Sequence, residues 1–169
     1  MGRALIICEK PSVAGDVAKA LFGGKGKKVA DRYEGPDAIV AFAVGHLVEQ
    51  VDPDAYDKTY KTWRYEDLPI LPEEFRYQPR DAKAAKTLAS LHKLMIKKDV
   101  DEIVNACDAG REGELIFKLI LQTAPEAAHE KPIKRAWFSS MTAGAIRDAF
   151  DELRDDEQMK PLEEAARAR

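Results

Sequence analysis

Short apolar runs alternate with amphipathic stretches along most of the chain. The apolar runs predict buried β-strands at residues 3–8, 38–44 and 101–107, and residues 132–138 are expected to form a last strand. The segments between them predict helices at residues 11–22, 81–98, 112–123 and 142–153. Strands that alternate with helices in this way favour an α/β fold, with a largely parallel central sheet flanked by helices.

Local signals predict where two of these helices begin or end. Ser12 is placed to cap the first helix, and Gly23-Gly24 is placed to end it. Thr142 is placed to cap the helix that runs to about residue 153. The charged residues 154–169 then favour the start of a further helix, without a terminating signal.

Residues 50–80 are irregular and lack a clean period. They hold four prolines, four tyrosines and Trp63. An irregular segment of this length inside a compact domain is usually functional or packed as a cover. Its aromatic and basic side chains could stack on bases. We favour the other interpretation, in which the aromatic side chains pin the segment to the core.

An acidic turn, Asp-Ala-Gly-Arg-Glu-Gly-Glu at residues 108–114, follows the third apolar run and leads into a helix. Three carboxylates at the C-terminal end of a strand suit a hard divalent cation, and open parallel sheets bind their ligands at that edge. Glu9 occupies the same context after the first apolar run. The sequence therefore predicts a metal site split between two strand ends. For the turn taken alone, a solvated loop is the alternative.

The sequence also supports predictions for one histidine, one further acid and the two cysteines. His46 follows the second apolar run and could contact a phosphate oxygen, or be satisfied by local backbone. Glu114 could supplement the metal site, but we favour a helix-start acid stabilised by the helix dipole. Cys8 and Cys107 each precede a proposed site acid. If their strands are neighbours, both sulfurs should lie on the face opposite the carboxylates, as buried and reduced core residues.

Composition narrows the class of protein. The 169 residues suffice for one domain and a fragment of a second, and 45% hydrophobic with 34% charged residues fits a globular protein. The net charge of −3 argues weakly against DNA binding, because an acidic site would offset local basic patches. No apolar run approaches the roughly 20 residues that span a bilayer, and no signal-peptide pattern is present. We expect a cytoplasmic protein without membrane contact.

Four ordered motifs resemble the N-terminal Toprim domain of type IA DNA topoisomerases. They are ICEKPSVA at 7–14, VGHL at 44–47, the acidic turn and WFSSMT at 137–142. The stretch WRYEDLPILP at 63–72 is similar to the topoisomerase III branch. The resemblance implies a Toprim (Rossmann-like) fold for residues 1–153, with 50–80 as an irregular insertion. It makes 154–169 the truncated start of the next topoisomerase domain.

The resemblance also implies roles for single residues. Glu9 would act near the scissile phosphate and, with Asp108 and Glu112, would bind Mg²⁺. Lys10 and Arg111 would be catalytic groups beside the phosphate and the DNA backbone. Contacts to a single-stranded DNA segment would come from Lys10, His46, Arg111 and Ser139.

The implied reaction is transesterification, in which a tyrosine attacks a DNA phosphodiester and the ends later rejoin. Mg²⁺ and Lys10 would neutralise the phosphate, and Glu9 is a candidate for proton transfer to the leaving oxygen. The family's nucleophilic tyrosine belongs to a later domain, and none of the five tyrosines here lies in that region. We therefore expect a nucleoid-associated protein whose activity needs its remaining domains, so that this chain alone does not cleave DNA.

One position departs from the family's D-x-D-x-E pattern, because Gly110 stands where the second Asp is expected. This loss argues against a two-metal arrangement and favours a single Mg²⁺, which needs only one or two carboxylates plus phosphate oxygens. Two other classes of protein remain open. One is a stand-alone Toprim metal-dependent nuclease or primase-like protein, and the other is a non-catalytic interaction domain whose site has decayed.

Overall fold

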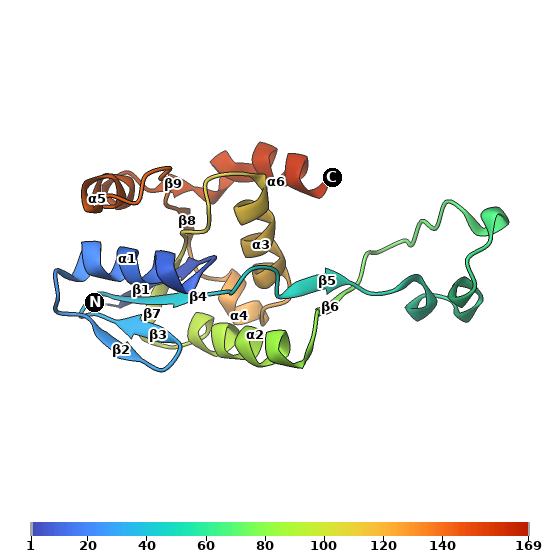
Figure 1. Cartoon of the computed structure of the whole chain (residues 1–169), viewed down its shortest axis with the longest axis horizontal. Helices are drawn as coiled ribbons and strands as arrows, with labels where there is room; N and C mark the ends of the chain where they lie inside the picture. Colours follow the sequence, from blue (N-terminus) through green and yellow to red (C-terminus); the bar gives the residue numbers. More distant parts are fainter. Residues whose placement is uncertain (1, 169) are drawn as a thin grey trace.

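A computed structural model describes residues 2–168 of the chain (Figure 1). Its main sheet has the strand order β2-β3-β4-β1-β7-β8-β9. The neighbours β4, β1, β7 and β8 run parallel, whereas the pairs β2–β3, β3–β4 and β8–β9 are antiparallel. The strands are β1 (Arg3–Cys8), β2 (Lys27–Val29), β3 (Arg32–Glu34), β4 (Ala38–Phe42), β7 (Val100–Asn105), β8 (Ile133–Arg135) and β9 (Arg154–Asp155). The predicted α/β fold with a largely parallel sheet is confirmed.

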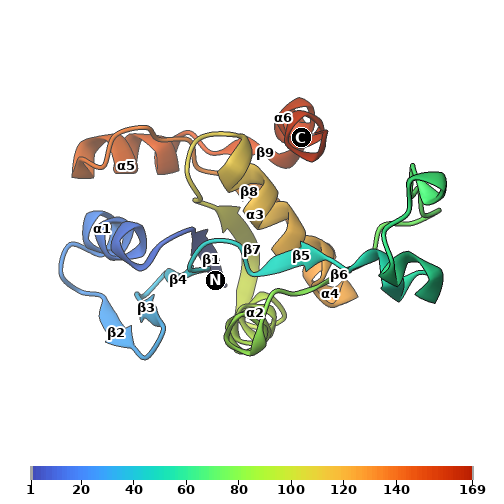
Figure 2. The ribbon, with the colours of Figure 1, turned by 45° about the vertical axis from the view of Figure 1, so that its right-hand side comes forward.

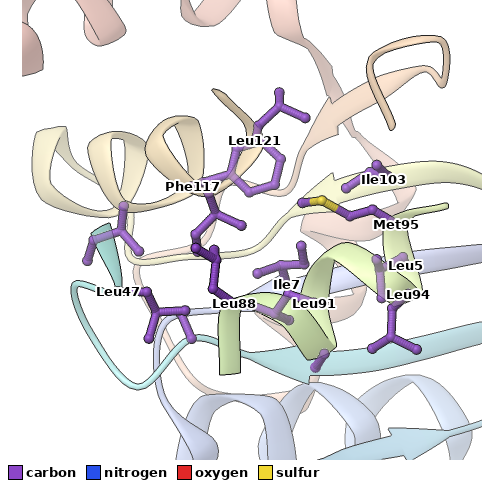
Figure 3. Packing of buried hydrophobic residues seen from close by; sticks show 14 of the residues in the cluster. Leu5, Ile7, Leu47, Leu88, Leu91, Leu94, Met95, Ile103, Phe117 and Leu121 are labelled. Atoms are coloured by element: carbon purple, nitrogen blue, oxygen red, sulfur yellow. The ribbon is translucent and has the colours of Figure 1, made fainter. Parts of the chain in front are cut away.

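Helices cover both faces of this sheet. On one face lie α1 (Pro11–Phe22) and α5 (Ala143–Asp151), and on the other α2 (Ala82–Met95) and α3 (Arg111–Gln122). The side chains of β1 alternate between the two cores, because successive residues of a strand point to opposite faces. Leu5 and Ile7 pack with α2 and α3, as Figure 3 shows, whereas Ile6 and Cys8 pack with α1.

The ends of the elements correct several expectations, since β7 ends at Asn105 rather than residue 107 and β8 at Arg135 rather than residue 138. Lys10, not Ser12, is the residue before α1, and no side chain caps that helix. The expected end at Gly23 is confirmed, since its φ of 55° is left-handed, and Thr142 caps α5 through a 3.3 Å bond to the amide of Ala145. Strand β4 ends at Phe42 rather than residue 44, because Val44 has a φ of 66°, which a strand does not allow.

Residues 51–76 form an arm that leaves the body (Figures 1 and 2). It is rooted in the two-stranded sheet of β5 (Val48–Gln50) and β6 (Tyr77–Pro79), and carries short helical turns at Pro53–Ala55, Lys58–Lys61 and Tyr65–Asp67. The expectation that its aromatic residues pin it to the core is wrong for Trp63 and Tyr65, which are 76% and 91% exposed.

The arm is instead held by contacts within itself. The amide of Arg76 donates to Tyr56 Oη at 2.7 Å, and the Arg76 guanidinium stacks 4.5 Å from that ring. Of the aromatic residues expected to anchor the segment, Tyr77 at its base does pack against the core of the body.

The C-terminal segment packs on the same body. Strand β9 pairs with β8, and α6 (Lys160–Arg167) lies against α3. The buried Lys118 of α3 joins them through ion pairs of 2.7 Å to Asp156 and 2.9 Å to Glu163. The assignment of 154–169 to a following domain stays a prediction, and its last residue lies outside the described part. Within residues 2–168, none of the helices, including the short α4 (Glu126–His129), has the length and apolar character needed to cross a bilayer.

Candidate functional site

The parallel pairing of β1 with β7 brings two acids to one edge of the sheet. The register places Ile7 beside Asn105, and each strand ends within three residues of an acid. Glu9 follows β1 and is only 8% exposed, whereas Asp108 follows β7 and is exposed. The predicted meeting of the two strand ends is thus present in the fold.

Lys10 lies between these two acids. Its ammonium is 2.9 Å from Asp108 Oδ2 and 3.2 Å from Glu9 Oε1. Asp108, and then Glu9, raise the pKa of Lys10 above its usual value, because both carboxylates stabilise the charged form. Two carboxylates that come from distant parts of the sequence therefore share one cation at this edge.

A second contact at the same edge joins His46 to Glu112. The chain after β4 turns through Val44 and Gly45, both with positive φ, and their amides donate to Glu9 O at 2.9 and 3.1 Å. This turn carries His46 Nε2 to 2.5 Å from Glu112 Oε1 in the first turn of α3. His46 thus has a carboxylate partner, rather than only the local backbone that the sequence left as an alternative.

The two remaining predicted residues have no such contact. Arg111 is exposed at the first position of α3. Ser139 is exposed beyond β8, where it lines a hollow of about 290 Å³ with Trp137 and Asp148. In the described part of the chain, no hydrogen bond or ion pair links Ser139 to Glu9 or Asp108. Their contacts to DNA therefore remain predictions.

A buried polar network lies beneath the Asp108 turn, and sequence reasoning missed it. Arg135 of β8 is 1% exposed and donates to the carbonyl oxygens of Asn105, Cys107 and Asp108 at 3.1, 2.8 and 2.8 Å. Glu114 is 0% exposed and places Oε2 at 3.5 Å from Arg135 Nε. Burial raises the pKa of Glu114 and lowers the pKa of Arg135. The expectation that Glu114 serves only as a helix-start acid is therefore incomplete, because Glu114 also belongs to this buried network.

The cysteine expectation is partly wrong. Both cysteines are buried and free, as expected. However, Cys8 packs with the α1 side of the sheet and Cys107 with the α3 side. The register Ile7–Asn105 makes Cys8 level with Ala106, so that the two sulfurs point to opposite faces. Burial raises the pKa of both thiols and keeps them protonated.

The arrangement offers few ligands to a divalent cation. In residues 2–168, no three His, Cys, Asp or Glu side chains gather closely enough to form a ready metal cage, and Glu112 faces His46. Glu9 and Asp108 do converge on one cation, the Lys10 ammonium. Because hard divalent cations take oxygen ligands, these two carboxylates could supply part of the coordination of such an ion.

Several known proteins are similar to this chain in sequence. The chain is similar to DNA topoisomerase 3 of Staphylococcus haemolyticus, at 43% identity over 167 residues, covering 99% of this chain and 23% of that protein. The same-named proteins of Shouchella clausii and Bacillus subtilis are 42% and 41% identical over 170 residues, covering all of this chain and 22% of each relative. The chain thus spans less than a quarter of these relatives. A model of the Toprim domain matches residues 4–141, the stretch that builds the parallel sheet and both acidic strand ends, and this chain belongs to the Toprim family.

Proposed function

We propose that this chain is the Toprim domain of a type IA, topoisomerase III-like DNA topoisomerase. It would supply the acidic and basic groups for cleavage and rejoining of a single DNA strand in the cytoplasm, at the nucleoid. The observation that carries the proposal is the Lys10 ammonium shared by Glu9 and Asp108 at the sheet edge where parallel folds bind ligands. The relatives' name supports the reaction class.

The residues at this edge have complementary tasks around a DNA phosphate. The Lys10 ammonium neutralises a phosphate oxygen, and a short move away from Asp108 frees that carboxylate. Glu9 and Asp108, joined by Glu112 if it leaves His46, would hold Mg²⁺, which supplies further charge neutralisation when bound. Glu9 is the most enclosed of the three acids, which supports the proposed role in passing a proton to the leaving oxygen.

The nucleophile of the reaction is proposed to come from another part of the intact protein. Of the five tyrosines here, Tyr56, Tyr60 and Tyr65 lie on the arm, where Tyr56 accepts a bond from Arg76, and Tyr77 packs on the core. Tyr33 is on β3, which is separated from β1 by β4. We therefore expect no covalent DNA adduct on the 169-residue chain. Magnesium-dependent DNA hydrolysis by the chain alone would favour the nuclease alternative.

A chimera tests the proposal. The matching segment of Bacillus subtilis DNA topoisomerase 3 is replaced by this chain, with which it shares 41% identity. We expect the chimera to relax supercoiled DNA in the presence of Mg²⁺, and Glu9→Gln to abolish that activity. The matched control is Glu49→Gln, which changes an exposed acid on β5 and should leave relaxation intact. A folded chimera without relaxation, or one indifferent to Glu9→Gln, contradicts the proposal.

A further inference from the structure

The segment between β7 and α3 carries Asp108 but belongs to neither element. Residues 106–110 are neither strand nor helix, and the ladder reaches only as far as the Ala106 amide, which donates to Ile7 O of β1 at 2.9 Å. Two of their carbonyl groups, those of Cys107 and Asp108, accept bonds from one buried guanidinium, Arg135. The position of Asp108 therefore depends on a side chain from the neighbouring strand.

Arg135 is itself fixed from two sides. Its Nη1 reaches both the carbonyl and the side-chain oxygen of Asn105 at 3.1 Å, and Trp137 lies 5.1 Å from its guanidinium carbon. The Asn105 amide nitrogen donates to Glu114 Oε2 at 3.1 Å, so that the acid of α3 is tied to the end of β7. Asn105 Oδ1 also accepts from the amide of Cys107 at 3.0 Å. The network thus joins β7, β8 and α3 around the turn.

The buried charges of Arg135 and Glu114 stabilise each other. A buried guanidinium or carboxylate is strongly unfavourable when its partner is removed. Arg135 and Glu114 are buried at 1% and 0% exposure, and Glu114 Oε1 has no hydrogen-bond partner within the described structure. A planar guanidinium can donate to several carbonyl oxygens at once, here those of Asn105, Cys107 and Asp108, which a lysine ammonium cannot reproduce. Arginine at this position therefore supplies hydrogen bonds in fixed directions, and not only a positive charge.

We propose that Arg135, held by Glu114 and Asn105, is a positioning residue that sets the place of Asp108 opposite Lys10 and Glu9. This inference rests on the proposed function, because it assigns the network a task in that same site. Arg135 acts through the backbone, since its Nη2 contacts the carbonyl oxygen of Asp108 and not the carboxylate that faces Lys10. Loss of the network would let the turn shift while the sheet stays intact.

The experiment compares three variants of the 169-residue chain by NMR. Arg135→Lys keeps the positive charge but loses the planar guanidinium. Glu114→Gln keeps the shape of the side chain but loses its negative charge. Lys118→Met is the control, because Lys118 is a buried charged residue of the same helix that forms ion pairs with Asp156 and Glu163 and acts on Glu114 through its charge alone. Readouts are the melting temperature, the carbonyl ¹³C shifts of residues 107 and 108, and the Kd for Mg²⁺.

We expect Arg135→Lys and Glu114→Gln to raise the Kd for Mg²⁺ by about tenfold to a hundredfold, the effect typical of residues that orient metal ligands. Arg135→Lys should also move the carbonyl shifts of residues 107 and 108. Lys118→Met should lower the melting temperature without changing the Kd. A purely structural role would lower the melting temperature in all three variants and leave the Kd equal, which overturns the inference.

The test separates this inference from the proposed function. If the wild-type chain shows no Mg²⁺-dependent shifts at Asp108, the metal part of the proposed function fails. The carbonyl ¹³C shifts of residues 107 and 108, recorded without metal, then test the positioning role of Arg135 by themselves. Unchanged shifts at residues 107 and 108 in Arg135→Lys contradict it, and shifts confined to those residues support it.

Discussion

Gly113 lies directly against the backbone of Asp108. A β-carbon built on Gly113 would be 2.2 Å from Asp108 O and 2.7 Å from Asp108 N. Contacts this short require the backbone to move, because neither atom belongs to a flexible side chain. The first turn of α3 can therefore approach the acidic turn only with glycine at this position.

Gly113→Ala should consequently destabilise the fold by about 1–3 kcal/mol, the range for overpacking a tight site, and should displace Asp108. Urea denaturation measures the first effect. Gly144→Ala in α5 is the control, because a β-carbon there meets nothing within 4 Å. That change should be neutral or stabilise by up to about 1 kcal/mol, since alanine favours helix. Equal stability of wild type and Gly113→Ala would show that the close approach is absent.

Gly110 offers room for the carboxylate that the family pattern expects there. Its φ of 171° is extended, and a β-carbon would meet nothing within 4 Å. We expect Gly110→Asp to fold normally and to bind Mg²⁺ more tightly, because a further carboxylate would join the site. Isothermal titration calorimetry measures the affinity.

Gly110→Asn separates charge from helix capping. Gly110 is the N-cap of α3, where Asp and Asn stabilise a helix to a similar degree. Both variants should thus gain the same few tenths of a kcal/mol in stability, and only Gly110→Asp should gain Mg²⁺ affinity. If both variants bind Mg²⁺ like the wild type, residue 110 does not face the site.

His92 should make stability depend on pH. Its Nε2 donates to Ile120 O at 3.1 Å, and burial lowers its pKa below the usual 6.5. The folded state thus favours the neutral ring. This contribution to stability is fully present above about pH 6.5 and is lost as the pH falls through the lowered pKa.

Urea denaturation of the His92→Gln variant between about pH 7.5 and 5 tests this dependence around the ordinary histidine pKa. The amide of Gln can replace the donor without taking up a proton, so the variant should lose less stability on acidification than the wild type. His129→Gln, at an exposed position, should retain the wild-type slope. Parallel slopes for wild type and His92→Gln would rule out the buried neutral ring as the cause.

The exposed arm should contribute little to the stability of the body. Trp63 and Tyr65 are exposed, and the arm is held by its own contacts. The double change Trp63→Ser and Tyr65→Ser should alter the free energy of unfolding by less than about 0.5 kcal/mol, as is usual for surface positions. Tyr77→Ser at the packed base of the arm is the comparison and should destabilise. A large loss from the double change would mean that the arm folds back on the core.

The sequence was enough to predict the main strands of the sheet. It was also enough to predict that Glu9 and Asp108 meet at one edge of the sheet. Apolar runs located β1, β4 and β7, because buried parallel strands are apolar on both faces. The strand-end rule then paired Glu9 with Asp108, although nearly a hundred residues separate them. These features are local in sequence, or follow from a general rule of sheet topology.

Other features depend on register and could not be predicted in the same way. A difference of one residue between β1 and β7 put Cys8 and Cys107 on opposite faces. The Arg135 network needs the pairing of β8 with β7, which no local pattern indicates. The one available signal was a charged residue inside an apolar strand run, because such a residue must find partners when buried. The exposure of Trp63 has no local signal of this kind.

The most direct test of the central claim uses Mn²⁺, which carboxylate sites accept in place of Mg²⁺, and paramagnetic broadening of backbone amides in the 169-residue chain with a short single-stranded oligonucleotide. We expect substoichiometric Mn²⁺ to broaden the amides around Glu9 and Asp108 together, and to leave the amides of the arm near Trp63 sharp. Broadening at only one of the two strand ends, or chiefly at the acidic residues of the arm, would contradict a single phosphate and metal site built by Glu9, Lys10 and Asp108.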